Sequence, residues 1–423
     1  GQARGHRDLQ PHSGLMRPAV RGACAIAAAC LGLLLAACDR GPTAVAWSEA
    51  ERAQIISLSL ANLAAPPPDP SNAYADDPRA VALGRRLFSD PRLSRNGQVA
   101  CATCHQPARL FTDGLPTSRG LGTARRHAPS LLTAAWSPWL FWDGRADSLW
   151  SQVLGPLQDP VEMGLTLAEV ATVIAGHYRA DYQALFGRMP SLQHPAPVSI
   201  KRIVTNVGKA LAAFERSLRP APAPFDAYAE ALRRNDARAD SLLDADERAG
   251  LRLFLGRGQC LRCHHGPLLT NHGFHNTGLG SLIGQAFDRG RADGVRVVLT
   301  SEFNCRGPYS DASSSNAGGS DAAARPCAQL EYARTGAAEL VGAFRTPSLR
   351  NVAVTAPYMH DGRFAELGAV LDHYNRAPGP AMQYGHTELF PLGLVARELA
   401  QLEAFLRTLT SAESTLAGME NSD

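Results

Sequence analysis

The sequence predicts a mainly α-helical protein made of two similar halves related by internal duplication. Two observations lead to this fold class: a set of short motifs occurs twice in the same order, and apolar residues such as Leu167, Val170 and Ile174 recur at helical spacing. With 423 residues, 45% of them hydrophobic, the chain is long enough to bury a substantial core. The formal net charge of +3 gives no basic stripe of the kind that binds phosphates, so nucleic acid is not expected as a partner.

The repeated motifs keep their spacing in both halves. Gly-Arg-Arg-Leu-Phe at 84–88 corresponds to Gly-Leu-Arg-Leu-Phe at 250–254. Further on, Pro-Ser-Leu at 129–131 and 347–349 is followed by Asp-Gly-Arg at 143–145 and 361–363, an interval of fourteen residues in both cases. The repeat predicts two copies of one unit, each beginning with a short amphipathic helix and closing with a helix after the Asp-Gly-Arg turn.

Each half also contains one Cys-x-x-Cys-His unit, formed by Cys101, Cys104 and His105 in the first half and by Cys260, Cys263 and His264 in the second. Such a unit attaches a haem through two thioether bonds and offers its histidine to the iron. A zinc half-site is the alternative, but a closed zinc site needs four ligands and the chain has no further Cys-x-x-Cys pair. The sequence therefore predicts two covalently bound haem c groups, haem 1 on His105 and haem 2 on His264.

The domain boundaries follow from these units. We expect two cytochrome-c-like haem domains at 78–225 and 240–412, joined near 220–242 where prolines interrupt the helical pattern, with a helix over 203–218. An insertion at 300–338, rich in Ser, Gly, Ala and Asp, is bounded by Cys305 and Cys327. A disulfide between these two cysteines would stabilise the loop by roughly 3 kcal/mol, and free thiols are the alternative. Residues 413–423 are expected to form a tail.

The first 38 residues have the pattern of an export signal. A short basic stretch from Met16 to Arg21 precedes an apolar run from Ala23 to Ala37, which is shorter than the roughly 20 residues that span a bilayer. The run ends in Leu-Ala-Ala-Cys, similar to a lipobox, which predicts lipidation of Cys38 and a periplasmic protein anchored to a membrane. An uncleaved anchor or an ordinary signal peptide is the alternative. The Ala- and Pro-rich segment 39–77 is expected to be a semi-rigid tether.

Four longer stretches make the sequence more specific: Phe-Trp-Asp-Gly-Arg-Ala at 141–146, Gly-Pro-Leu-Gln-Asp-Pro-Val-Glu-Met-Gly at 155–164, Thr-Pro-Ser-Leu-Arg-Asn-Val at 346–352 and Thr-Ala-Pro-Tyr-Met-His-Asp-Gly at 355–362. With them the chain resembles, over roughly 78–410, the bacterial two-haem cytochrome c peroxidase family, and within it the MauG branch. The resemblance implies an enzyme that reduces hydrogen peroxide at haem 1, with electrons relayed through haem 2 from a small periplasmic donor, a cytochrome c or cupredoxin. The alternatives are a MauG-like oxidase that modifies a partner protein and a pure electron-transfer di-haem cytochrome.

The resemblance also implies roles for three residues near haem 1. Trp142 matches the aromatic residue between the haems, Glu162 matches the distal carboxylate, and Gln152 matches a neighbouring polar position that orients water or peroxide. A carboxylate near the iron can take a proton from one peroxide oxygen and return it to the other. Without the resemblance, Trp142 would be read as a core residue and Glu162 as a surface charge.

His127 departs from the family pattern. That position usually holds an Asn that helps to bind a calcium ion between the haems, together with backbone carbonyls matching Thr355 and Pro357. The departure leaves the calcium ion open. It also indicates a haem 1 that is open without reductive activation, although movement of His127 onto the iron stays an alternative.

A difference between the halves predicts the sixth iron ligands. Thirteen residues beyond Asp361 lies Tyr374, whereas thirteen beyond Asp143 lies Pro156, which has no donor atom. We therefore expect Tyr374 to bind the iron of haem 2 and the corresponding position of haem 1 to stay vacant for peroxide. The MauG resemblance implies the same, since that branch has Tyr where its peroxidase relatives have Met; Met359 and His373 are the rival ligands.

Overall fold

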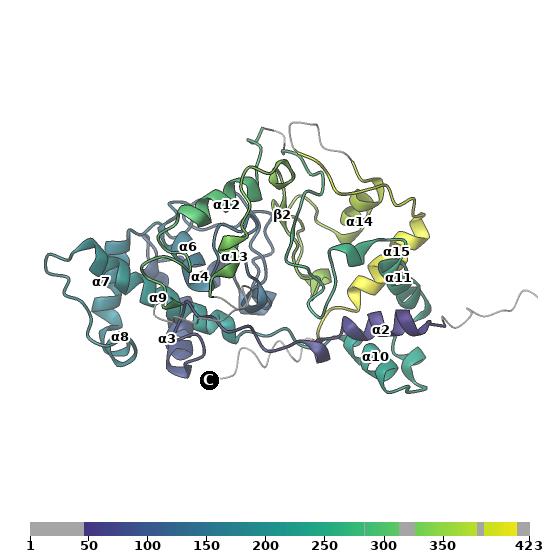
Figure 1. Cartoon of the computed structure of the whole chain (residues 1–423), viewed down its shortest axis with the longest axis horizontal. Helices are drawn as coiled ribbons and strands as arrows, with labels where there is room; N and C mark the ends of the chain where they lie inside the picture. Colours follow the sequence, from purple (N-terminus) through teal and green to yellow (C-terminus); the bar gives the residue numbers. More distant parts are fainter. Residues whose placement is uncertain (1–45, 283, 313–325, 379–384, 413–423) are drawn as a thin grey trace, which may run out of the picture. The chain divides into compact units, whose positions relative to one another are not determined.

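The computed structural model describes residues 46–282, 284–312, 326–378 and 385–412, and within them helices dominate. The predicted signal segment with Cys38 and the tail 413–423 lie outside the described residues. The only strands in the described part are β1 (Phe274–His275) and β2 (Phe344–Arg345), which pair antiparallel with Phe274 opposite Arg345. The helices, shown in Figure 1, are α2 (Glu49–Ser57), α3 (Pro78–Phe88), α4 (Cys101–Cys104), α5 (Leu149–Gln152), α6 (Leu154–Gln158), α7 (Leu167–His177), α8 (Arg179–Phe186), α9 (Pro197–Ser217), α10 (Pro224–Arg233), α11 (Ala245–Leu255), α12 (Arg291–Thr300), α13 (Ala328–Glu331), α14 (Leu367–Arg376) and α15 (Ala396–Arg407).

The core of the first half is built on the crossing of α3 and α9. Helix α3 begins where the Asp77 side chain accepts the N–H of Arg79, and it buries Leu83 and Leu87 on one face. The two helices meet at Gly84, where an added Cβ would collide with the backbone of α9. The ring of Phe88 lies 5.1 Å from that of Phe214 at this crossing. The expected helix over 203–218 forms the C-terminal part of α9, which begins earlier than predicted, at Pro197.

The second half repeats this crossing with α11 and α15. Helix α11 begins with a capping box between Asp244 and Glu247. Its Gly250 meets the backbone of α15 as Gly84 meets α9, and the rings of Phe254 and Phe405 lie 5.1 Å apart. The repeated motif at 84–88 and 250–254 therefore makes the same kind of helix contact in both halves, with α9 in the first and α15 in the second.

Residues 46–77, expected to be part of a tether, instead pack on both halves: α2 lies in the core of the second half, while Trp136 and Trp150 of the first half donate to Ala64 and Ser71. Helix α2 starts with a capping box between Ser48 and Glu51, and Ile55 and Leu58 are fully buried in the same core as Phe225 of α10. The apolar residues of this segment recur at helical spacing, which favours an amphipathic helix over an extended linker.

The helical pattern is interrupted between the end of α9 at Ser217 and the start of α10 at Pro224, but α10 itself occupies much of the expected linker near 220–242. Pro224 stands at the start of α10, where its fixed backbone suits a first helical turn, rather than breaking a helix. Asp226 of α10 pairs with Arg350 at 2.8 Å in the interior, and Arg350 also donates to the carbonyl of Leu58 at 2.7 Å. Arg350 thus joins α10 and the end of α2 to the second half.

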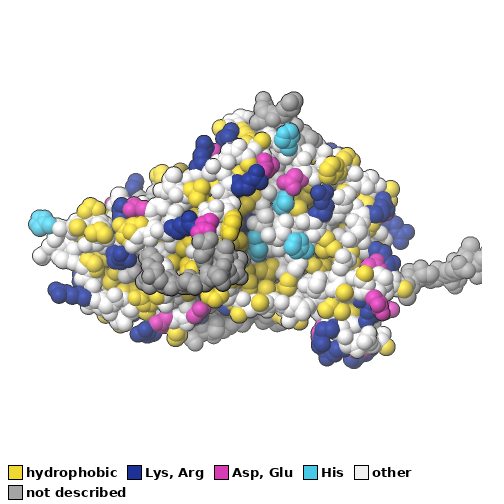
Figure 2. Space-filling view, in the orientation of Figure 1, with side chains coloured by type: hydrophobic (Ala, Val, Ile, Leu, Met, Phe, Trp, Pro, Cys, Tyr) yellow, Lys and Arg dark blue, Asp and Glu magenta, His cyan; other side chains and the backbone are white. Residues whose placement is uncertain are grey.

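The insertion packs on the first half. Cys305 and Cys327, predicted to pair, are joined by a disulfide in the structure, and the N–H of Cys305 donates to Asp147 at 2.8 Å. The buried Lys209 of α9 pairs with Asp311 at 2.7 Å. Basic and acidic side chains are interspersed over the face drawn in Figure 2. Among the described residues, no helix combines the length and apolar character needed to cross a membrane.

Candidate functional site

The first Cys-x-x-Cys-His unit forms the short helix α4 and the residue after it. Cys101 and Cys104 stand at the two ends of this turn, and both side chains are half-buried. His105 Nδ1 donates a hydrogen bond to the carbonyl of Phe111 at 2.9 Å, so Nε2 is the ring nitrogen that would bind a metal. Burial lowers the pKa of His105, so the imidazole is kept in its neutral, metal-binding form.

The second unit opens onto a cavity of about 290 Å³. His264 Nδ1 donates to the carbonyl of Leu269 at 2.9 Å, leaving Nε2 free, and burial lowers its pKa to about 4. Cys260 and Cys263 line the same cavity, together with apolar side chains from α11, α14 and α15. Two thiols, one free imidazole nitrogen and a mainly apolar wall fit a covalently attached haem.

Glu162 lies close to the first pair of cysteines. Burial is the largest cause that raises the pKa of Cys104 to about 11, and the negative charges of Asp113 and Glu162 add to it. Burial also raises the pKa of Glu162 itself. The loop is fixed by Leu121, whose N–H donates to the carbonyl of Glu162 at 3.0 Å, and by Gly120, where an added Cβ would come within 2.5 Å of that carbonyl oxygen.

Gln152 approaches the same region from α5. It is the last residue of α5, and Pro156, which lacks an N–H, stands within the next short helix, α6. The loop that follows folds back on α6, since the N–H of Met163 donates to the carbonyl of Pro156 at 3.1 Å. This return brings the segment of Glu162 alongside the segment of Gln152 and Pro156.

Trp142 belongs to the first half in sequence but borders the haem 2 cavity. Its indole N–H donates to the carbonyl of His127 at 2.8 Å, and its own carbonyl accepts the N–H of Arg345 at 2.8 Å. The side chain is 8% exposed. Trp142 therefore lies where the two halves meet.

The residues proposed as sixth ligands occupy different surroundings. Tyr374 on α14 and Met359 both line the haem 2 cavity, whereas His373 Nε2 hydrogen-bonds to the carbonyl of Thr277 at 2.7 Å. Tyr374 lies in an unbroken helix, but its counterpart Pro156 lies where the corresponding helix is split into α5 and α6. Both helical segments begin six residues after their Asp-Gly-Arg aspartate, so the two positions correspond.

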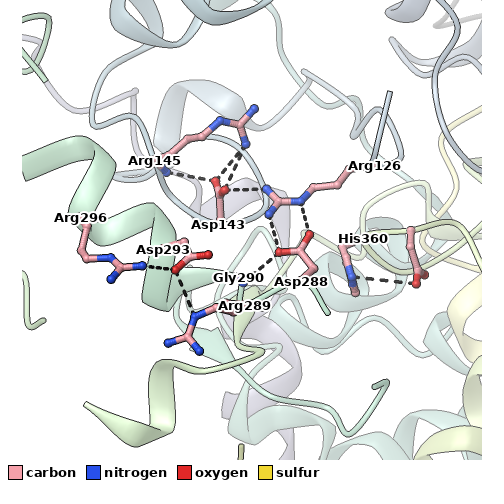
Figure 3. Close-up of polar contacts among 10 residues, drawn as sticks. Arg126, Asp143, Arg145, Asp288, Arg289, Gly290, Asp293, Arg296 and His360 are labelled. Carbon is pink, nitrogen blue, oxygen red and sulfur yellow. Dashed lines mark hydrogen bonds and ion pairs between the residues drawn. The ribbon is translucent and has the colours of Figure 1, made fainter. Parts of the chain in front are cut away.

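An ion-pair network at the junction of the halves, drawn in Figure 3, was not anticipated from the sequence. Arg126 pairs with Asp143 at 2.7 Å and with Asp288 at 2.8 Å, so its guanidinium joins a carboxylate of each half. Arg291 adds a second link, donating to the carbonyl of Gly144 at 2.6 Å. Charged residues in loops give no periodic signal, which is why the sequence did not reveal these pairs.

The structure does not test the calcium ion that the sequence left open. The His127 side chain has ring nitrogens where the family pattern has an amide oxygen, and its Nδ1 donates to the carbonyl of Leu115 at 2.8 Å. In the described part of the chain, no group of three or more His, Cys, Asp or Glu side chains is arranged to hold a metal ion. Calcium takes six to eight oxygen ligands, and His127 offers one oxygen fewer than an Asn would.

Three further residues of the two sites escaped the sequence analysis. His360 and Arg345 line the haem 2 cavity, and Glu215 of α9 is close enough to Cys101 for its charge to raise the pKa of that thiol, after the larger effect of burial. A repeat between Leu-Ala-Ala-Phe-Glu-Arg-Ser-Leu at 211–218 and Leu-Glu-Ala-Phe-Leu-Arg-Thr-Leu at 402–409 would have drawn attention to Glu215. Two attachment sites of this kind on a helical scaffold place the protein among the c-type cytochromes.

Comparison with known proteins gives the family. Residues 78–234 match the family described as di-haem cytochrome c peroxidase. The methylamine utilization protein MauG of Methylorubrum extorquens is 32% identical over 346 residues, 80% of each chain. Cytochrome-c peroxidase IdrP1 of Pseudomonas sp. strain SCT is 31% identical over 399 residues, 89% of this chain and 95% of the relative. The solved structure of the diheme peroxidase BthA from Burkholderia thailandensis aligns with a TM-score of 0.63 at 26% identity, over 82% of this chain and 89% of that one.

The chain belongs to the di-haem cytochrome c peroxidase family, which includes MauG. It is therefore an oxidoreductase, and family membership implies two c-type haems. Because relatives of similar identity are named peroxidase and MauG, membership alone does not separate these two activities.

Proposed function

We propose that this chain is an exported di-haem cytochrome c peroxidase that reduces hydrogen peroxide at an open haem 1 with electrons relayed through haem 2. The observation that carries this proposal is the difference between the two sites at one equivalent position. Tyr374 borders the haem 2 cavity, while Pro156 occupies the matching position of the first half. Tyr374 would offer its phenol oxygen to the iron of haem 2, whereas Pro156 has no donor atom to offer haem 1, so peroxide would bind at haem 1.

The residues around haem 1 move protons during the reaction. The haem would provide the redox chemistry, and reduction of one hydrogen peroxide to two waters consumes two electrons from the donor and two protons from solvent. Glu162 takes the proton from the nearer peroxide oxygen and returns it to the leaving oxygen, and its raised pKa suits both steps. Gln152 orients the bound peroxide by hydrogen bonding. The hydrogen bond from His105 Nδ1 to the carbonyl of Phe111 fixes the orientation of the imidazole ring.

Trp142 provides the route between the two sites. It comes from the loop that leads into α5 and borders the haem 2 cavity, so one aromatic ring shortens the gap that electrons cross. The electrons originate from a small periplasmic donor, a cytochrome c or a cupredoxin. The equivalent crossings at Gly84 and Gly250 support an origin of the two halves by duplication of one haem-binding unit.

The export pattern of residues 1–38 supports a periplasmic location with a lipid anchor on Cys38. Mass spectrometry of the membrane fraction tests this part separately. A mature chain that begins with a lipid-modified Cys38 is expected. An unmodified N-terminus at another residue contradicts the anchor without affecting the peroxidase proposal.

A MauG-like oxidase, which uses peroxide to oxidise a partner protein through long-range electron transfer, is the second candidate. Tyr374 favours the MauG-like oxidase, because the MauG branch has tyrosine at the position of the haem 2 ligand. Peroxide turnover of the haem-loaded protein with a panel of reduced cytochromes and cupredoxins separates the candidates. Rapid turnover with a small donor is expected for a peroxidase. Peroxide reactivity without donor turnover favours the oxidase, and the absence of any peroxide reaction favours a pure electron-transfer cytochrome.

A further inference from the structure

A buried carboxyl group with no use in the mechanism above lies in the last turn of α9. Glu215 is 4% exposed, and its Oε2 atom is buried without a hydrogen-bond partner in the described structure. Burial raises the pKa of Glu215 to about 8, and no charged neighbour contributes to this shift. A buried carboxyl group without a partner favours its protonated form because desolvation penalises the charge.

The second half identifies what Glu215 faces. Gly84 meets α9 at Ala210 and Phe214, and Gly250 meets α15 at Gln401 and Phe405, so the two helix crossings superimpose residue by residue. In this register Glu215 corresponds to Leu406. Leu406 lines the haem 2 cavity, and its neighbour Cys260 corresponds to Cys101.

Glu215 occupies the matching place in the first half, since its charge acts on Cys101. The first haem site therefore has a carboxyl group where the second has a leucine. The two haem sites therefore differ at two equivalent positions: Glu215 against Leu406, and Pro156 against Tyr374.

We propose that Glu215 is a proton-exchanging group of haem 1, which releases its proton when haem 1 loses an electron and regains one when haem 1 is reduced. This inference rests on the proposed function, because it requires a haem on Cys101, Cys104 and His105. Removal of one electron from a haem held by Cys101, Cys104 and His105 would leave one additional positive charge near Glu215. Release of one proton from its carboxyl group restores the local charge, and the return of one electron from the donor brings one proton back.

The other titratable groups around Glu215 have partners of their own or lie apart from it. Helices α5 and α6, which pack on α9, carry no titratable side chain, and Cys101 ceases to titrate once it forms a thioether. Two other acids stand near the first attachment unit, Asp113 and Glu162, whose charges act on Cys104. His177 of α7 is exposed. The charged side chains of α3, α7 and α9 have other partners: Arg79 with Asp77, Arg86 with Asp181, Glu169 with Thr166, Lys201 with Glu302, Lys209 with Asp311, Arg216 with Asp76, and Arg85 and Arg202 over the rings of Phe214 and Tyr309. Glu162 and His105 lie on the other segments of the haem 1 site and serve the peroxide and the iron.

The sign of the effect follows from the charges. A positive charge on haem 1 favours the carboxylate of Glu215, so alkaline conditions stabilise the oxidised haem. The midpoint potential of haem 1 therefore falls as pH rises through the neutral and mildly alkaline range. Leu406 gives haem 2 no counterpart of Glu215, so any pH dependence of the haem 2 potential comes from other lining groups such as His275 and stays unchanged when Glu215 is replaced.

Redox titration of the haem-loaded protein at several pH values tests the proposal. Two variants are compared with the wild type: Glu215→Gln, which keeps the size, and Glu215→Leu, which copies the second half. Both are expected to keep two covalent haems and to lose the pH dependence of the haem 1 potential, with haem 2 as the internal control. A Glu162→Gln variant measures how much of the dependence belongs to the distal carboxylate.

Infrared difference spectra of oxidised and reduced protein provide a second readout. The carbonyl band of a buried protonated carboxyl group is expected to change between the two states in the wild type and to be missing in Glu215→Gln. An unchanged pH dependence in both variants overturns the inference while the peroxidase proposal stands. A wild-type protein that binds no haem on the first unit overturns both.

Discussion

Substitution of Gly84 by Ala is expected to destabilise the first half by about 2 kcal/mol. An added Cβ would approach the carbonyl oxygen of Ala210 to well under 3.0 Å, the limit that real Cβ atoms respect, and would lie 2.9 Å from Phe214 Cβ. Because the obstacle is backbone, no rotamer relieves it, and α3 and α9 would have to separate by about 1 Å, at a cost near the upper end of the usual 1–3 kcal/mol for overpacking. The higher helix propensity of Ala offsets about 1 kcal/mol of this cost.

Urea unfolding followed by circular dichroism measures the change, and the haem absorption reports on the site at the same time. Gly176→Ala in α7 is the matched control, since an added Cβ there meets nothing within 4 Å, and it should be neutral or stabilising by up to about 1 kcal/mol. Gly250→Ala should behave like Gly84→Ala but weaken the second half. An unfolding free energy of Gly84→Ala within about 0.5 kcal/mol of the wild type would refute the helix crossing as described.

Four other expectations concern the sites. Replacing Cys260 and Cys263 by Ala should remove one of two haems on a haem-stained denaturing gel, and full stain in that variant would contradict the second attachment site. Glu162→Gln should keep both haems and slow the reaction of haem 1 with peroxide by about 10²-fold in stopped-flow kinetics, so an unchanged rate removes Glu162 from the mechanism. Tyr374→Phe should abolish the low-spin haem 2 signal in electron paramagnetic resonance, whereas a retained signal would transfer the ligand role to Met359. A calcium chelator should leave the thermal midpoint unchanged, and a clear decrease would reveal an ion that the residues do not predict.

The sequence predicted the parts of the fold that repeat. The spacing of the motifs around the two Cys-x-x-Cys-His units led to two helical units, and the crossings at Gly84 and Gly250 have the same geometry. Helix α2 was missed because the Pro-rich stretch after it dominated the composition, although Ile55 and Leu58 are core residues. Composition describes a segment as a whole, whereas packing depends on a few apolar positions.

For the site, motif resemblance proposed residues inside the stretches that match the family, such as Trp142 and Glu162. It missed residues outside those stretches, such as Arg126 and Glu215. Arg126 and Asp288 are far apart in the sequence and form their ion pair only in the folded chain. No sequence pattern in either loop predicts this pair. Glu215 was overlooked because a single acidic residue in a long helix is usually a solvated charge, and only its alignment with Leu406 shows that it faces inward.

Helix α2 has a consequence for the order in which the protein is assembled. Ile55 and Leu58 are made early, but their core partners Phe225 and Leu409 come far later in the chain. The second half can therefore close only after synthesis has passed the end of α15, and until then Ile55 and Leu58 stay without these partners. Haem 2 would thus be enclosed late, while the first half holds all the helices of its own crossing much earlier in synthesis.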